Sequence, residues 1–163
     1  AFYLYHGAAY ERTGQLATAE RIFEECIKRY PESHIVLNYL AYMWAESGKK
    51  LNKALKHVDR ALTLAPDSAA YRDTRGWIFF KQKHYDKALA EIEKARELMG
   101  ADAEIMDHLG DIYSALKNRE KAVACWSESY TLDPKNESVA EKLTECGVNL
   151  DSILLDAITI EKK

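Results

Sequence analysis

Three polar residues in one short stretch of the chain could bind a metal. Asp107, His108 and Asp111 lie in the stretch AEIMDHLGDIY, and His108 and Asp111 are three residues apart, which puts them on one face of a helix. An imidazole and a carboxylate are ligands for divalent transition metals. The remaining histidines fall at unrelated places in the chain, where none is positioned to join the pair: His6, His34, His57 and His84.

Other catalytic patterns are missing from the sequence. There is no glycine-rich phosphate loop and no nucleophile elbow. The three cysteines form no metal-type Cys-x-x-Cys pair, and their odd number does not make a disulfide framework: Cys26, Cys125 and Cys146. We expect them to be small buried thiols. The sequence therefore predicts no enzyme, no catalytic residue, no metal site and no cofactor.

Composition narrows the class of protein further. The chain has 163 residues, of which 47% are hydrophobic and 30% charged, with a net charge of −3. This balance is typical of a folded domain, and the net charge does not favour a nucleic-acid partner. The apolar runs are too short for direct membrane insertion. The chain opens on Ala1 without Met, so we expect it to continue a longer polypeptide.

The helices that must position these residues show an unusual aromatic pattern. The stretch DTRGWIFFKQKHYDKAL, residues 73–89, holds Trp77, Phe79 and Phe80 close together. Trp77 and Phe80 share a helix face, whereas Phe79 points elsewhere. A helix that is apolar on two faces must contact more than one neighbour.

Three sets of residues recur with one period. Small residues at helix contacts are spaced by 34, 35 and 34 residues: Gly7, Ala41, Gly76 and Gly110. Alanines in the following helix are spaced by 35, 34 and 34: Ala19, Ala54, Ala88 and Ala122. Helix-ending residues follow the same spacing of 35, 34 and 34: Pro31, Pro66, Gly100 and Pro134. All three sets place one extra residue near Lys49 and Lys50.

This period is similar to that of the tetratricopeptide repeat superfamily. The stretch FFKQKHYDKA, residues 79–88, resembles its consensus and departs at Lys83-His84, where Gly-Asp is usual. The resemblance covers residues 1–136 as four repeats, 1–33, 34–68, 69–102 and 103–136. It implies an all-α, right-handed α-α superhelix in which each repeat is helix, turn, helix. In the first repeat, Gly14 marks the turn and Pro31 follows the second helix.

Residues 137–163 differ from the repeats. Residues 137–146 look like a degenerate fifth first helix. An amphipathic helix follows, with Asn149 as its N-cap and an apolar face of Leu150, Ile153, Leu154, Ala157 and Ile158. Such a helix caps the open end of a repeat array, or it docks a partner or a second copy.

The resemblance also implies a binding groove. In tetratricopeptide proteins the first helix of each repeat lines the concave side, at positions that here include Leu4, Ile35 and Glu46. The partner-binding residues that this register predicts are Tyr5, Asn38, Tyr39, Tyr42, Asp73, Trp77, Phe80, Asp107, His108 and Asp111. The groove would be aromatic in its middle and acidic toward the fourth repeat, which favours a partner with a basic segment.

The register assigns different environments to the aromatic residues. Phe79 takes the packing position that Tyr10, Trp44 and Tyr113 hold in the other repeats. Tyr42, Trp77 and Phe80 are expected to form an exposed strip with Asn38 beside it. The alternative is that Tyr39, Tyr42 and Trp77 pack against neighbouring helices or the cap.

We therefore expect a non-catalytic module that binds a peptide or helix of a partner protein in the groove, as part of a larger scaffold. The residues of the clamp with which related co-chaperones grip a C-terminal carboxylate are absent. The alternative function is self-assembly into a homo-oligomer through the ends of the array or the C-terminal helix. Residues 36–134 also resemble the C-terminal repeats of bacterial envelope scaffold lipoproteins, which implies an envelope location, and a cytoplasmic one otherwise.

Overall fold

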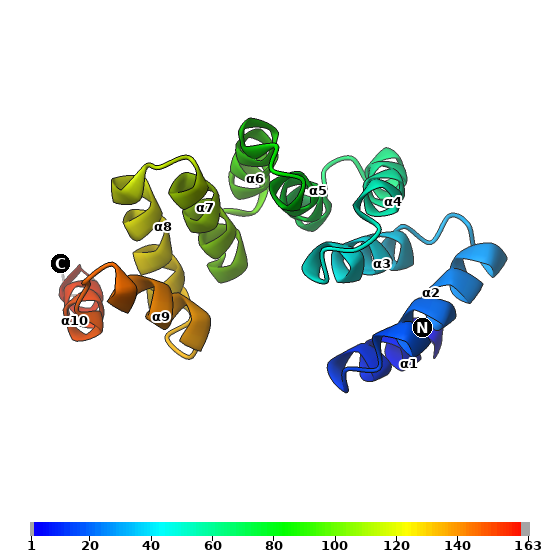
Figure 1. The fold of residues 1–163 in the computed structure, drawn as a ribbon, viewed down its shortest axis with the longest axis horizontal. Coiled ribbons are helices and arrows are strands. Elements are labelled where there is room, and N and C mark those ends of the chain that lie inside the picture. Colours follow the sequence, from blue (N-terminus) through cyan, green and yellow to red (C-terminus); the bar gives the residue numbers. More distant parts are fainter. Residues whose placement is uncertain (1, 161–163) are drawn as a thin grey trace. The chain divides into compact units, whose positions relative to one another are not determined.

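The computed structural model describes the backbone of residues 2–160 and the side chains of residues 3–155. Within this range all regular structure is helical (Figure 1), which confirms the predicted fold class. The helices are α1 Phe2–Arg12, α2 Leu16–Arg29, α3 His34–Glu46, α4 Leu51–Leu64, α5 Ala69–Lys81, α6 Tyr85–Met99, α7 Ala103–Ala115, α8 Arg119–Leu132, α9 Glu137–Glu145 and α10 Leu150–Ile160.

The chain divides into two compact units, residues 1–91 and 92–163, with the boundary inside α6. In the first unit α1 packs on α2, α3 packs on α4, and both α3 and α4 contact α5. In the second unit α7 packs on α8, α8 packs on α9, and α10 rests on α8 and α9. The four repeat boundaries and the division at residue 136 stay predictions.

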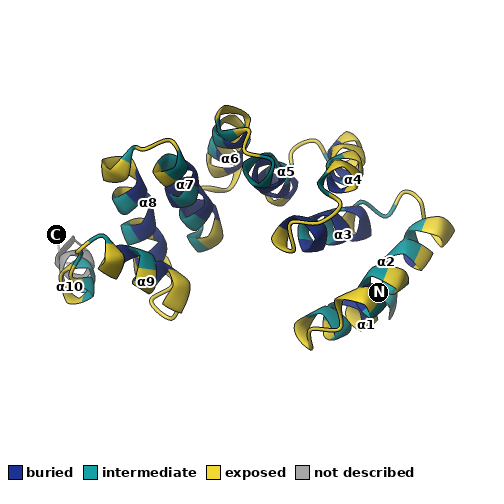
Figure 2. Ribbon diagram, in the orientation of Figure 1, coloured by how far each residue is buried: buried dark blue, intermediate teal, exposed yellow. Residues whose placement is uncertain are grey.

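Small residues let paired helices come close. A Cβ placed on Gly7 would overlap the ring of Phe23, and one on Gly110 would overlap the indole of Trp126. The recurring alanines of the second helices are likewise buried: Ala19, Ala54, Ala88 and Ala122. Buried positions, dark blue in Figure 2, run along α3, α5, α7 and α8. The recurring small residues are therefore helix contacts, as the period predicts.

Each pair closes through the same turn. The second residue after the first helix is left-handed in the pairs α1–α2, α3–α4, α5–α6 and α7–α8, with φ between 62° and 75°: Gly14, Gly48, Lys83 and Lys117. A backbone N–H beyond it donates, over 2.9–3.0 Å, to a carbonyl in the last turn of the first helix, and the acceptors are Tyr10, Trp44, Phe79 and Tyr113. These are the four residues that the register assigns to one position, and they accept the same backbone hydrogen bond at the turn.

The extra residue of the second pair lies in its turn. In the other three pairs the left-handed residue directly precedes the residue before the second helix, whereas Lys49 separates Gly48 from Lys50. Lys50 is itself left-handed, with φ 52°. Its carbonyl still accepts from the N–H of Ala54 at 2.9 Å, as Gln15 accepts from Ala19 at 3.1 Å. The insertion therefore leaves the register of α4 intact.

The C-terminal helix begins as predicted. The N–H of Asp151 donates to Oδ1 of Asn149 at 3.0 Å, which makes Asn149 the N-cap of α10. The face of α10 with Leu150, Ile153 and Leu154 packs against a buried cluster of Ala122, Trp126, Tyr130, Val139 and Leu143. This contact supports the capping role. The side chains of Ala157 and Ile158, predicted on the same face, lie outside the described residues.

The contact between Gly110 and Trp126 yields a first prediction. Gly110→Leu should lower the free energy of unfolding by about 1–3 kcal/mol or more, because the new side chain meets an indole that is held in place. Urea titration followed by circular dichroism measures the loss. Ser114→Leu, at an exposed position one turn further along α7, is the control and should change stability by less than about 0.5 kcal/mol. Equal melting of Gly110→Leu and wild type would contradict the close contact.

Candidate functional site

Trp77 is not part of an exposed strip, so this expectation is wrong. Its side chain is 6% exposed and belongs to the core of the first unit. The ring of Phe80 stacks on it, with centroids 4.7 Å apart and planes 5° from parallel, and Nζ of Lys81 lies 4.6 Å from its centroid. Its Nε1 donates to the carboxylate of Glu46 at 2.5 Å. Groups from α3 and α5 therefore close over the indole.

Phe79 is less buried than Trp77, which reverses the expected order. Phe79 is half-buried and its ring contacts side chains beyond the turn: His84, with centroids 6.4 Å apart, and Lys87, with Nζ 5.7 Å from the ring. These two side chains cover the ring of Phe79 only in part. Trp77, rather than Phe79, is the larger apolar contribution of this helix to the core.

The remaining aromatic positions of the first unit divide into packed and open ones. Tyr39 is half-buried with its ring 5.4 Å from that of Phe23, and Tyr42 is half-buried against the same core. Tyr5 is 71% exposed. Asn38 is half-buried, and its Oδ1 is closed off from solvent and accepts no hydrogen bond from any described residue. The packing alternative therefore holds for Tyr39, and Tyr5 is the open aromatic group.

A pocket of about 520 Å³ lies among α1, α2 and α3 in the first unit. Two of its residues, Leu4 and Ile35, are groove positions in the repeat register, and Ile35 is 49% exposed. Tyr30, 53% exposed, adds an aromatic wall. Nη1 of Arg29 donates to the hydroxyl of Tyr3 at 3.1 Å at the same pocket. The pocket thus offers apolar walls with a polar edge.

In the second unit the predicted acidic positions are already paired. Nζ of Lys142, on α9, lies 2.6 Å from Oδ1 of Asp107 and 2.7 Å from Oδ1 of Asp111. Nε1 of Trp126 also donates to Asp111 at 3.1 Å. Lys142 was not singled out in the sequence, although it lies one 34-residue period after His108. That spacing could have placed it beside the groove positions.

Burial and charge act against each other in this cluster. Burial raises the pKa of Asp107, Lys142 lowers it, and the net shift is upward. Burial lowers the pKa of Lys142, but its hydrogen bonds to Asp107 and Asp111 outweigh burial, so the net shift is again upward. The ammonium group thus stays charged between the two carboxylates. Asp111 is held by this cation instead of being available to a metal shared with His108.

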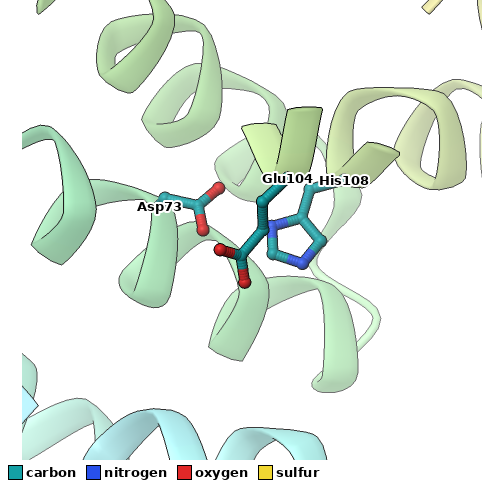
Figure 3. Close-up of side chains that lie close together, drawn as sticks. All are labelled: Asp73, Glu104 and His108. Carbon is teal, nitrogen blue, oxygen red and sulfur yellow. The ribbon is translucent and has the colours of Figure 1, made fainter. Parts of the chain in front are cut away.

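The other polar groove positions have mixed exposure. Glu104 and His108 lie one turn apart on α7 with their side chains next to each other (Figure 3). His108 is buried and Glu104 is exposed. Asp73 is buried on α5 in the first unit. All three make polar interactions. Asp73 and His108 are therefore not the open groove residues that the register predicts.

Helix pairs that repeat with a common period and close through one type of turn define an α-helical repeat protein. Two family models identify it further. The model described as "Psidin, N-terminal TPR repeats region" matches residues 40–153, and the model described as "Tetratricopeptide repeat" matches residues 1–43. The chain belongs to the tetratricopeptide repeat family, as its period predicts.

Comparisons with individual proteins agree with this family. TPR repeat-containing protein PA4667 of Pseudomonas aeruginosa is 32% identical over 72 residues, which are 44% of this chain and 12% of that protein. The solved structure of the APC/C hetero-tetramer Cut9-Hcn1 matches with a TM-score of 0.76 and 21% identity, over 87% of this chain and 28% of that one. A crystal structure of MamA matches with a TM-score of 0.67 and 18% identity, over 96% and 94%. At these identities the solved structures show the fold alone.

The family consists of non-catalytic protein–protein interaction modules. No described helix combines the length and hydropathy that a membrane-spanning segment needs.

The burial of Trp77 yields a second prediction. Trp77→Ala should lower the free energy of unfolding by about 3–5 kcal/mol, because it removes a buried ring and leaves Phe80 without its stacking partner. Phe79→Ala should cost less, since that ring is half-buried. Thermal and urea unfolding of both variants give the comparison. A larger loss for Phe79→Ala would restore the environments assigned from the register.

The ion pairs of Lys142 yield a third prediction. Lys142→Met should cost about 1–3 kcal/mol, less than a fully buried pair, because 25% of the lysine side chain is exposed. The pKa of Lys142 lies above its ordinary value of 10.5, so once the carboxylates are ionised the pairs stabilise fully up to that pH, and they lose their effect as pH rises through the folded-state pKa. The difference between wild type and variant should therefore shrink above pH 10.5.

Urea titrations at several pH values measure this difference. Lys135→Met, at an exposed position in the turn between α8 and α9, is the charge-matched control. A loss in Lys142→Met that matches the control, or that does not vary with pH, would contradict a stabilising role for the two ion pairs.

Proposed function

We propose that the chain binds a peptide or helix of a partner protein in the groove lined by the first helices of its repeats, as one part of a larger scaffold. Membership of a family of interaction modules supports binding to protein. The chain spans 12% of PA4667 and 28% of Cut9, but 94% of MamA. Cut9 was crystallised with Hcn1 as an APC/C hetero-tetramer.

The observation that carries the proposal is the apolar pocket of the first unit. Its volume of about 520 Å³ is enough for a large apolar side chain. Ile35 and Tyr30 expose apolar surface. Covering that surface with an apolar side chain of the partner would stabilise the complex, because it removes the surface from water. Tyr5, on the neighbouring helix α1, adds a rigid aromatic surface of the kind that is common in binding hot spots. We therefore assign the partner an apolar anchor residue.

The expected basic segment of the partner has less support in this groove. Asp107 and Asp111 already hold Lys142, so a partner cation would have to displace it. Asp73 and His108 are buried. Among the uncharged predicted groove residues, Tyr5 is exposed, and the half-buried ones can still touch a ligand: Asn38, Tyr39, Tyr42 and Phe80. The buried ring of Trp77 stacks against Phe80.

A fourth prediction tests the pocket. Ile35→Glu puts a charge into the apolar wall and should weaken partner binding roughly thirtyfold, the effect of losing a hot spot of about 2 kcal/mol. Cross-linking pull-downs from source cells identify the partner, and calorimetry then measures the affinity of each variant for it. Leu64→Glu, an exposed apolar position at the end of α4, is the matched control and should bind as wild type does.

Other results would redirect the assignment. Unchanged affinity in Ile35→Glu, with loss in Leu64→Glu, would move the binding surface away from the groove. Self-assembly is the alternative favoured by the exposed side chain of Leu155 on α10. A mass in light scattering that rises with concentration and falls to the monomer in Leu155→Glu would support it over partner binding.

A further inference from the structure

One face of α9 is open in the second unit. Five residues at i, i+3, i+4, i+7 and i+8 line a shallow pocket of about 430 Å³ on it: Glu137, Ala140, Glu141, Thr144 and Glu145. The opposite side of α9 is closed, because Val139 and Leu143 are fully buried against α8. Within residues 3–155 the three glutamates are exposed, and their carboxylates form no ion pair and accept no hydrogen bond.

The same molecule shows what this arrangement of carboxylates binds. Glu141 and Glu145 lie 34 residues after Asp107 and Asp111, so they hold the same positions of the repeat on the next first helix. Asp107 and Asp111, also four residues apart, bind the ammonium group of Lys142 at 2.6 and 2.7 Å. The cation comes from the helix that follows α7 and α8 in the array. No such helix follows α9 among the described residues, where α10 packs on α8 and α9 instead.

We infer that the open face of α9 binds a helix of another protein that presents a lysine or arginine to Glu141 and Glu145, as Lys142 is presented to Asp107 and Asp111. Ala140 and Thr144, at the centre of the face, are small enough for a helix to approach closely. The glutamates at the edge supply charge complementarity. Glu141 and Glu145 hold the repeat positions of two predicted groove residues, so this inference rests on the proposed groove function and extends it to α9. Its test uses none of the residues that line the apolar pocket of the first unit, so the two proposals can fail separately.

A second copy of the chain fits this face less well than a foreign helix. The repeat position of Lys142 is occupied, at spacings of 34, 35, 34 and 34, by Tyr5, Tyr39, Thr74, His108 and Lys142. A copy stacked through α1 would present Tyr5, which carries no positive charge, and would cover the glutamates without pairing them. A helix with a lysine or arginine would form ion pairs with the glutamates, so we assign the face to a basic helix of another protein.

The probe for this face is the lysine-bearing helix of the chain itself. A fluorescein-labelled peptide of residues 134–148 keeps Lys142 and its helical context, and its own acidic and thiol groups are removed by Glu137→Gln, Glu141→Gln, Glu145→Gln and Cys146→Ser. Fluorescence anisotropy at low salt measures its affinity for the whole chain. Amide chemical shifts of ¹⁵N-labelled protein locate the binding face.

We expect the peptide to bind and to shift the amides of Ala140, Thr144 and their neighbours on α9. The double variant Glu141→Gln/Glu145→Gln should bind about fivefold more weakly, because each partly exposed ion pair contributes modestly. The control Glu120→Gln/Glu128→Gln removes the same charge from exposed positions of α8 and should bind as wild type does. A peptide that also carries Lys142→Met should lose the same factor. Melting temperatures of both double variants check that the fold is unchanged.

Four outcomes would overturn the inference. They are equal affinity in the two double variants, amide shifts confined to other helices, no binding to wild type at about 1 mM peptide, and self-association of the wild-type chain that Glu141→Gln/Glu145→Gln abolishes. The last outcome would assign the face to a second copy.

Discussion

The close approach of paired helices is the constraint on which the rest of the structure depends. At Gly110 the missing side chain lets the indole of Trp126 lie against the backbone of α7. The same contact fixes where Nε1 of Trp126 points, and it donates to Asp111. Asp111 then shares Lys142 with Asp107, which ties α9 to α7. One glycine thus links the packing of a helix pair to the charge arrangement of the next repeat.

The fold could be predicted because its determinants repeat locally. Small residues, turn residues and helix-ending prolines recur independently of one another, and each acts through backbone geometry that the residue type alone dictates. Even Lys83 and Lys117, which depart from the usual glycine, take the left-handed conformation that their position requires. The period is defined by many residues, so a departure from the consensus at one position does not change the predicted fold.

The surface could not be predicted in the same way. The register tells which way a Cβ points, but the exposure of a ring depends on the long side chains around it. The register assigns Trp77 to the groove side of α5, but its ring is covered because Glu46 and Lys81 reach it. Lys142 likewise reaches from α9 to pair with Asp107 and Asp111, which the register assigns to the acidic end of the groove. A prediction made one position at a time does not include the side chains that extend from one repeat to the next.

The insertion between Gly48 and Lys50 bears on how such an array tolerates changes in length. An added residue within a helix would rotate every later side chain by about 100° and move buried alanines toward solvent. Here the added residue is absorbed where the chain turns, through a second left-handed residue, and Ala54 keeps its buried place. The turns therefore accommodate changes in chain length. A residue can be inserted there without rotating the helices that follow, so related chains can differ in turn length and still superimpose helix by helix.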